Sequence, residues 1–145
     1  KVEYERGSYL SARRINTAGF VYTGEWKFNQ PHGLGRLYVP DRSYYIGTFI
    51  GGSANGYGRN IYSNCAYYEG QVRNNKAEGT GVFISEADGY SYRGDWLNDL
   101  PSGRGVEKWL DGTTYEGEFL RGKKHGKGKF LDSAGNLYDG SFIDG

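Results

Sequence analysis

YTGEW, at residues 22–26, is a five-residue word that occurs six times along the chain with small changes. The other copies are YIGTF at 45–49, YEGQV at 68–72, YRGDW at 92–96, YEGEF at 115–119 and YDGSF at 138–142. Successive central glycines lie 23, 23, 24, 23 and 23 residues apart. A fixed period of roughly 20–50 residues is typical of repeat proteins, in which each unit packs on its neighbours.

Two further signals recur with the same period. A G-x-G word begins nine residues after the central glycine, at 33–35, 56–58, 79–81, 103–105 and 126–128. Asn, Asp or Gly stands third after the last residue of the five-residue word, at 29, 52, 75, 99 and 122. These residues tolerate positive φ, so we expect a left-handed turn there. With turn pairs such as Asp-Gly at 88–89 and 111–112, each unit is predicted to be strand, five-residue loop, strand and turn, which is a β-hairpin.

The alternation of side chains along a strand assigns the residues of the word to two faces. Tyr22, Gly24 and Trp26 share one face, whereas Glu25 and Lys27 lie on the other. The same pattern in later copies predicts one face of rings around glycine and one face that is largely charged. Because glycine has no Cβ, neighbouring rings are expected to lie against the backbone and to stack.

The composition narrows the possible function. With 14 Tyr, 7 Phe and 3 Trp the chain is too aromatic for a disordered segment, and its 25 glycines match the repeated backbone positions. A net charge of +1 provides no strong field for nucleic acid, and no nucleic-acid partner is expected. The single Cys65 and the absence of a signal sequence point to a reducing compartment, and no apolar run is long enough to cross a bilayer. A chain that begins at Lys1 is expected to be a fragment.

The words YTGEWKFNQPHGLGRLY (22–38), YRGDWLNDLPSGRG (92–105) and DGTTYEGEFLRGKKHGKGKF (111–130) resemble MORN repeats (membrane occupation and recognition nexus). The resemblance implies an all-β fold, an elongated twisted ribbon of tandem antiparallel β-hairpins with an aromatic groove. It covers residues 19–145 as five full hairpin units and one half unit, with residues 1–18 as a degenerate N-terminal repeat or cap. Val72 replaces the ring, and Asn55 and Glu78 replace the family histidine, so the third unit is expected to be the loosest or to be locally specialised.

The resemblance also implies a non-catalytic scaffold or adaptor in the cytoplasm, associated with a cytoskeletal or ciliary assembly. A ribbon one layer thick cannot cover all its rings, and an exposed aromatic strip usually marks a partner surface. The predicted partner groove, which would take an extended or helical protein segment, consists of Tyr22, Trp26, Tyr45, Phe49, Tyr68, Tyr92, Trp96, Tyr115, Phe119 and Tyr138. The alternative is that the rings only fill the curled interior. A homodimer through end or edge strands is a further expectation.

A basic stretch at 121–129 suggests a second function. Its cations, with no acid among them, are Arg121, Lys123, Lys124, Lys127 and Lys129. They could contact an anionic partner such as a phosphoinositide, or they could be a solvated hairpin tip. A third possibility is an accessory module of a larger enzyme such as a lipid kinase.

Catalytic signals are weak, and no catalytic, cofactor-binding or metal-binding residue is predicted. GGSANGYG at 51–58 has Tyr57 where a phosphate-binding loop requires lysine. Glu116 and Glu118 share a face, but that face is predicted to be an exposed sheet surface rather than a cleft. His32 and His125 occupy one repeat position and are expected to be loop residues whose side chains donate to nearby carbonyls.

Overall fold

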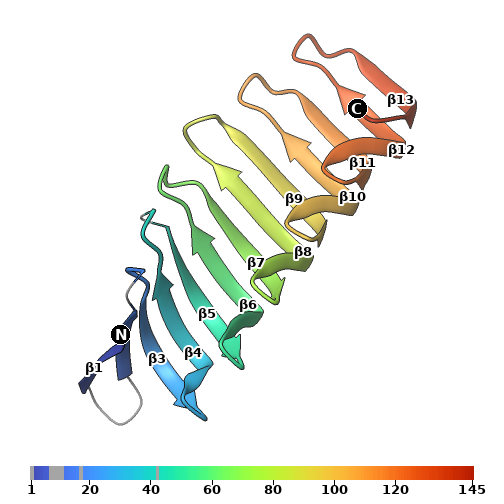
Figure 1. Cartoon of the computed structure of the whole chain (residues 1–145). Coiled ribbons are helices and arrows are strands. Elements are labelled where there is room, and N and C mark those ends of the chain that lie inside the picture. The colour runs from blue at the N-terminus through green and yellow to red at the C-terminus, as the bar shows by residue number, and fades with distance from the viewer. Residues whose placement is uncertain (1, 7–11, 17, 42) are drawn as a thin grey trace. The chain divides into compact units, whose positions relative to one another are not determined.

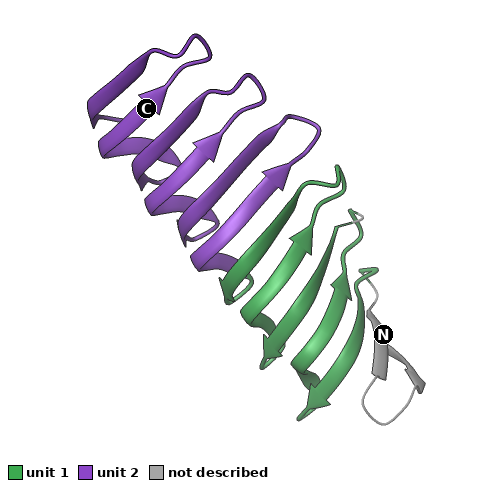
Figure 2. Ribbon diagram, turned by 180° about the vertical axis from the view of Figure 1, so that it is seen from behind, with its two compact units in different colours: residues 1–75 green, residues 76–145 purple. Residues whose placement is uncertain are grey.

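The structure of the protein is a computed structural model. It describes residues 2–6, 12–16, 18–41 and 43–145, and the first two of these ranges are described as backbone only. The described residues contain thirteen β-strands and no helix. They form two compact units, residues 1–75 and 76–145 (Figure 2). Neighbouring strands within each unit pair antiparallel in sequence order, which confirms the all-β fold of tandem hairpins.

The first unit is a sheet of seven strands in the order of the chain (Figure 1). Part of the predicted N-terminal cap lies outside the described residues, at 1, 7–11 and 17. The strands are β1 Val2–Arg6, β2 Ala12–Asn16, β3 Val21–Lys27, β4 Gln30–Tyr38, β5 Tyr44–Ile50, β6 Ser53–Ile61 and β7 Tyr67–Arg73.

The second unit repeats this arrangement with six strands, again in sequence order. The five-residue words at 92–96 and 115–119 lie on β9 and β11, and the G-x-G words at 103–105 and 126–128 lie on the strands that follow them, β10 and β12. The strands are β8 Lys76–Ser85, β9 Tyr90–Leu97, β10 Leu100–Lys108, β11 Thr114–Leu120, β12 Lys123–Leu131 and β13 Leu137–Phe142.

The hairpin turns are shorter than predicted. Only two residues separate the two strands of each hairpin from β3–β4 to β11–β12, so the expected five-residue loop is wrong in length. Phe28 and Asn29 between β3 and β4 have φ of 51° and 61°, and Asn98 and Asp99 between β9 and β10 have 50° and 68°. Two consecutive positive φ values match the right-handed twist of the flanking strands, which explains why a tight turn suffices. The predicted left-handed position is correct.

The remaining loop residues are absorbed into a β-bulge on the second strand. The register shifts between Pro101 and Gly105, where β10 pairs with β9. At the bulge, the backbone N–H of Arg104 donates to Asp95 Oδ2 at 2.9 Å. The residue at this position is also the acceptor in other units. The N–H of Leu34 donates to Glu25 Oε2 at 2.5 Å, and the N–H of Tyr57 donates to Thr48 Oγ1 at 3.1 Å. An acceptor side chain directly after the central glycine therefore holds the bulge at Glu25, Thr48, Asp95 and Glu118, a role that was not predicted from the sequence.

The core of each unit is a row of tyrosines resting on paired glycines. Tyr92 and Tyr115 are fully buried. A Cβ placed on Gly105 would lie 2.5 Å from Tyr92 Cζ, so only glycine leaves room for that ring. The rings meet edge to face rather than stacked: Tyr92 and Phe119 have centroids 5.0 Å apart at 87°. This geometry brings the positive ring edge to the negative ring face, which explains the departure from the predicted stacking.

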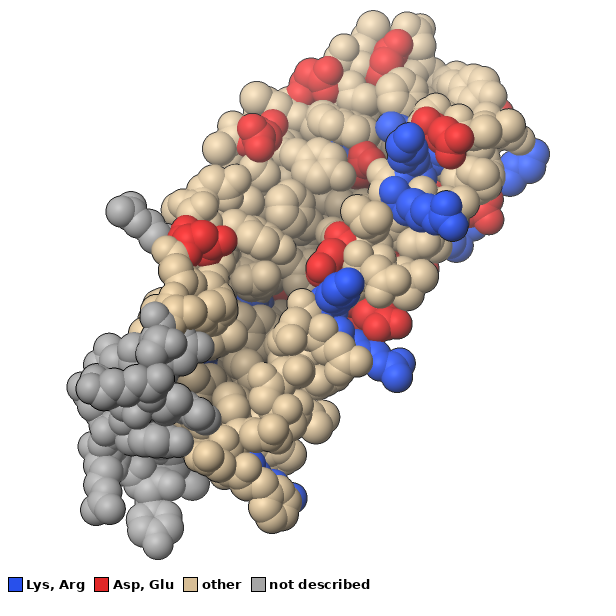
Figure 3. Space-filling view, viewed as in Figure 1, with Lys and Arg blue, Asp and Glu red and all other residues tan. Residues whose placement is uncertain are grey.

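The opposite face differs between the units. In unit 1, exposed Leu34 and Tyr57 interrupt the predicted charges, so the charged-face prediction is only partly right there. In unit 2 the face carries Arg93, Glu116 and Lys129, all exposed. Figure 3 shows Lys and Arg side chains beside Asp and Glu on the right of its view, whereas Asp and Glu alone appear at the upper left.

Candidate functional site: an aromatic pocket and its filled counterpart

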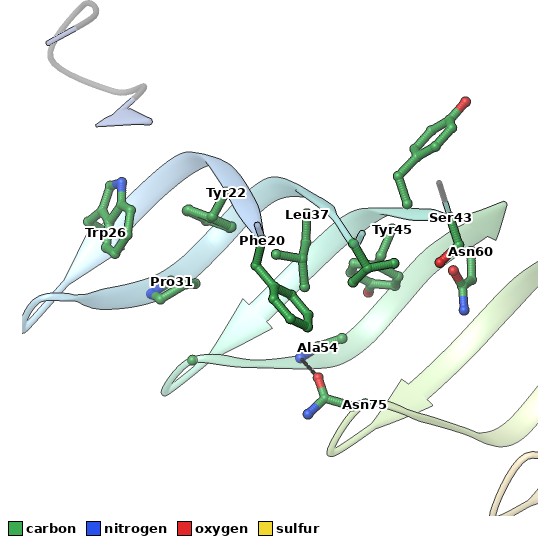
Figure 4. A pocket seen from close by; sticks show the side chains of 13 residues that line it. Phe20, Tyr22, Trp26, Pro31, Leu37, Ser43, Tyr45, Ala54, Asn60 and Asn75 are labelled. Atoms are coloured by element: carbon green, nitrogen blue, oxygen red, sulfur yellow. Dashed lines mark hydrogen bonds between the residues drawn. The ribbon is translucent and has the colours of Figure 1, made fainter. Parts of the chain in front are cut away.

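The ring face of unit 1 contains an open pocket of about 550 Å³. Figure 4 shows its side chains arriving from the segment before β3, from β3 to β6 and, at Asn75, from the turn after β7; most of its wall is formed by rings and aliphatic groups. Its principal lining residues are Phe20, Tyr22, Trp26, Pro31, Leu37, Ser43, Tyr45, Ala54, Asn60 and Asn75. A largely apolar concavity with a few polar groups is the usual form of a recognition site.

The pocket floor is uncharged. Tyr22 and Tyr45 donate their hydroxyls to the carbonyls of Glu25 and Thr48 at 2.7 and 3.2 Å. Burial, together with the nearby Glu25 carboxylate, raises the pKa of Tyr22 to about 12. Burial likewise raises the pKa of Tyr45 to about 12. Both rings therefore stay neutral across the physiological range and present hydrocarbon to a ligand.

A small side chain at residue 54 keeps the pocket open. Ala54 is buried, and its N–H donates to Asn75 Oδ1 at 2.8 Å, the contact drawn as a dashed line in Figure 4. The N–H of Asn75 returns a bond to the Ala54 carbonyl at 3.0 Å. Asn75 has φ of 68° in its turn, so the turn of one hairpin clamps the preceding strand. These two hydrogen bonds join this part of the wall to the next turn, and the methyl group of Ala54 leaves the space beside it open.

Most of the ten predicted groove residues lie in the core rather than at the surface. In unit 1 four are buried and only Trp26 is partly exposed; in unit 2 four are buried and only Tyr138, at 52%, is open to solvent. The buried members are Tyr22, Tyr45, Phe49, Tyr68, Tyr92, Trp96, Tyr115 and Phe119. The groove stays a prediction, and the pocket adds residues that the sequence analysis did not name, notably Phe20, Pro31 and Leu37.

The corresponding ring face of unit 2 is occupied by the chain itself. Lys124 stands at the repeat position that Ala54 holds in unit 1, and its Nζ lies 5.0 Å from the Trp109 ring centroid and 5.6 Å from that of Tyr115. Glu107, 6% exposed, sits on the same face, in register with Tyr92 and Tyr115. Burial raises the pKa of Glu107, and the charge of Lys124 and a side-chain hydrogen bond with Tyr90 oppose that rise.

The basic stretch does not form one patch. Lys124 turns onto the ring face, whereas Lys127 donates to Ser141 Oγ at 3.0 Å. Lys129 lies between Glu116 and Asp139 in the strand register. Arg121 and Lys123 are exposed at the turn. The five cations are thus divided among the turn and both faces of the sheet.

The residues considered as catalytic candidates from the sequence, among them Glu118 and His125, lie within the hairpins. Glu118 accepts the backbone N–H of Lys127 at 2.5 Å, so it is the bulge acceptor of its unit. The Nδ1 atom of His125 is buried without a hydrogen-bond partner among the described residues, so the predicted bond to a carbonyl does not involve that atom. Within residues 2–6, 12–16, 18–41 and 43–145, no three His, Cys, Asp or Glu side chains gather as metal ligands. The same part of the chain has no helix that could span a membrane.

Comparison with known proteins adds a family and a fold. The chain is 35% identical over 91 residues to Alsin of Rattus norvegicus and 34% identical over 91 residues to Alsin of Homo sapiens. Each match covers 59% of this chain but only 6% and 5% of the relatives, so the chain spans a small part of their length.

Among solved structures, the TCP domain of Drosophila melanogaster SAS-4, in complex with a proline-rich motif of Ana2, has a TM-score of 0.54. It is 11% identical, with 92% of this chain and 73% of that chain covered, which shows a shared fold. The MORN repeat model matches residues 22–44, 45–64, 68–87, 92–114 and 115–137, which is most of the chain. The resemblance in the sequence is thereby confirmed: the chain belongs to the MORN-repeat family.

Proposed function

We propose that the protein is a non-catalytic scaffold that binds an extended, proline-containing segment of a protein partner in the unit 1 pocket. The observation that carries this proposal is the open pocket of about 550 Å³, walled by Phe20, Tyr22 and Trp26. Segments in the polyproline II conformation dock on aromatic-lined grooves because they are already extended and lose little entropy. The proline-rich motif bound to the SAS-4 domain, a protein of related fold, supports the same class of occupant.

Trp26 and Phe20 are the side chains expected to contact the segment. Both remain partly accessible, whereas the tyrosines beneath them are buried. Large rings that keep some exposed surface at a concave site are the usual energetic centres of an interface. Tyr22 and Tyr45 would support them from below, with their hydroxyls already bonded to backbone carbonyls.

A peptide-binding measurement on the full chain tests this proposal. The probe is a fluorescein-labelled peptide of about ten prolines, with a Gly-Ser peptide of the same length as its control, followed by fluorescence anisotropy. Trp26→Ala is expected to weaken binding by about tenfold, which corresponds to about 1.4 kcal/mol. Ala54→Leu should do the same by filling the pocket.

Tyr57→Ala is the matched control because that ring is 58% exposed on the opposite face. The proposal fails if the proline peptide does not bind, if the Gly-Ser peptide binds as well, or if Ala54→Leu leaves the affinity unchanged.

On the basis of the family resemblance, we also propose that the protein is cytoplasmic and belongs to a cytoskeletal or ciliary assembly. Self-association through edge strands has some support from β13. Among the described residues, β13 is the last strand of the sheet order and pairs with β12 alone. The phosphoinositide alternative and the enzyme-accessory alternative stay predictions.

A further inference from the structure

The side chain of Glu107 is a carboxylate buried in the sheet, where the charged form loses the solvation that water would give it. It is 6% exposed and lies between two fully buried tyrosines. The other units carry Leu37, Asn60, Phe83 and Phe130 at this position, none of which is charged. Because the fold forms with uncharged side chains there, a buried carboxylate is not a requirement of the hairpin. In the free protein a side-chain hydrogen bond with Tyr90 and the charge of Lys124 offset its desolvation cost, so this place in the sheet offers a carboxylate that a cation stabilises.

The cation near Glu107 is Lys124, and the lysine at this repeat position is also unlike its equivalents in the other units. The equivalent residues in the other units are Pro31, Ala54, Ala77 and Pro101. The Lys124 Nζ lies over the faces of three rings, at 5.0 Å from Trp109, 5.6 Å from Tyr115 and 5.9 Å from Phe130. Rings on several sides with a carboxylate nearby form the environment in which proteins hold an ammonium or guanidinium group.

The same place in unit 1 is an open pocket. There Ala54 replaces the lysine, and the space it leaves is continuous with the rings of Tyr22 and Tyr45. Lys124 is only half-buried, and its stem is flexible, so its head can move into water. Withdrawal of Lys124 would leave the unit 2 counterpart of that pocket, with Trp109 and Glu107 in its wall.

We propose that this face of unit 2, formed by Glu107, Trp109, Tyr115 and Phe130, is a recognition site for a basic side chain of a partner segment. Lys124 occupies it in the free protein and must be displaced. This inference rests on the proposed scaffold function and specifies the partner chemistry: a lysine or arginine in the bound segment. Unit 1 accepts an uncharged group, because its pocket lacks a carboxylate at the equivalent positions Leu37 and Asn60.

The test uses the full chain and two short peptides. The probe is an acetylated, amidated peptide Ala-Ala-Lys-Ala-Ala, and its control has norleucine in place of lysine. Binding is followed by the indole N–H signal of Trp109 in ¹⁵N–¹H NMR spectra, assigned with Trp109→Phe. Lys124→Ala opens the site and is expected to bind the lysine peptide at least about tenfold more tightly than the wild type.

Three variants distinguish recognition of the peptide's lysine from a Glu107–Lys124 pair that only stabilises the fold. Lys124→Met removes the charge but keeps the stem in place, so it should show no gain. Glu107→Gln combined with Lys124→Ala keeps the shape of the site and should lose the gain. Lys123→Ala, at the exposed neighbouring position, should bind as the wild type does.

The proposal is overturned if Lys124→Ala, shown to be folded by circular dichroism, binds the lysine peptide no better than wild type. It is equally overturned if the norleucine peptide binds as well, or if the Glu107→Gln change has no effect. The proline peptide reports on unit 1 alone. Its failure to bind would remove the unit 1 proposal and leave the lysine-peptide result standing, and the reverse also holds.

Discussion

Replacing Gly105 by alanine tests whether the repeated glycines exist to seat the tyrosines. Gly105 does not lie in the positive-φ region, so alanine is compatible with its backbone conformation. Its added Cβ would fall 2.5 Å from Tyr92 Cζ and 2.6 Å from Cε2. Tyr92 is fully buried, so its ring has no free space into which it can retreat.

The expected cost follows from two contributions. Overpacking of a well-packed core costs about 1–3 kcal/mol. Displacing the ring also breaks the hydrogen bond from Tyr92 Oη to the Asp95 carbonyl, 2.8 Å long, for about 1 kcal/mol more. The free energy of unfolding should therefore fall by about 2–4 kcal/mol. Urea denaturation followed by tryptophan fluorescence and far-ultraviolet circular dichroism measures this change.

A double-mutant cycle supplies the control. Tyr92→Ala alone should cost about 3–5 kcal/mol, as other large ring deletions do. With the ring gone, Gly105→Ala has nothing to displace, so the double variant should be more stable than the sum of the single changes by about 1–3 kcal/mol. An additive pair, or a Gly105→Ala variant within about 0.5 kcal/mol of wild type, would refute the seating role.

Three further changes address the turns, the bulge and the buried carboxylate. Asp95→Ala should lower the free energy of unfolding in a urea titration by about 1 kcal/mol because it removes the acceptor for the Arg104 N–H, while Asp95→Thr should restore most of it. Asn75→Gly keeps the positive φ of the turn but deletes the side-chain acceptor, so it should cost about 1 kcal/mol by the same measurement, with Asn75→Asp neutral. Burial holds the pKa of Glu107 above its unfolded value, so its stabilising contribution is complete below about pH 4 and is lost as the pH rises through the folded pKa. Lys124→Ala removes the opposing charge and should enlarge the drop in urea midpoint between about pH 4 and pH 8; an unchanged drop would contradict this.

The sequence by itself determined the repeat and its local geometry. The period of the YTGEW word, the G-x-G word and the residues able to adopt positive φ together predicted tandem antiparallel hairpins, because strand and turn preferences act over a few residues. The same locality explains why Asn29 was placed correctly in a left-handed turn although the loop around it was predicted too long.

The tertiary structure decided which aromatic rings are buried and which groups the charged side chains contact. Whether Tyr92 is surface or core depends on the strands on both sides of it. Lys124 lies against rings because the register across the bulge pairs it with Phe119 on the neighbouring strand. The same repeat position is an open pocket at Ala54 and a filled one at Lys124. Burial and electrostatic pairing are set by groups that are distant in the chain, so the spacing of residues could specify the sheet but not which parts of its ring face remain accessible.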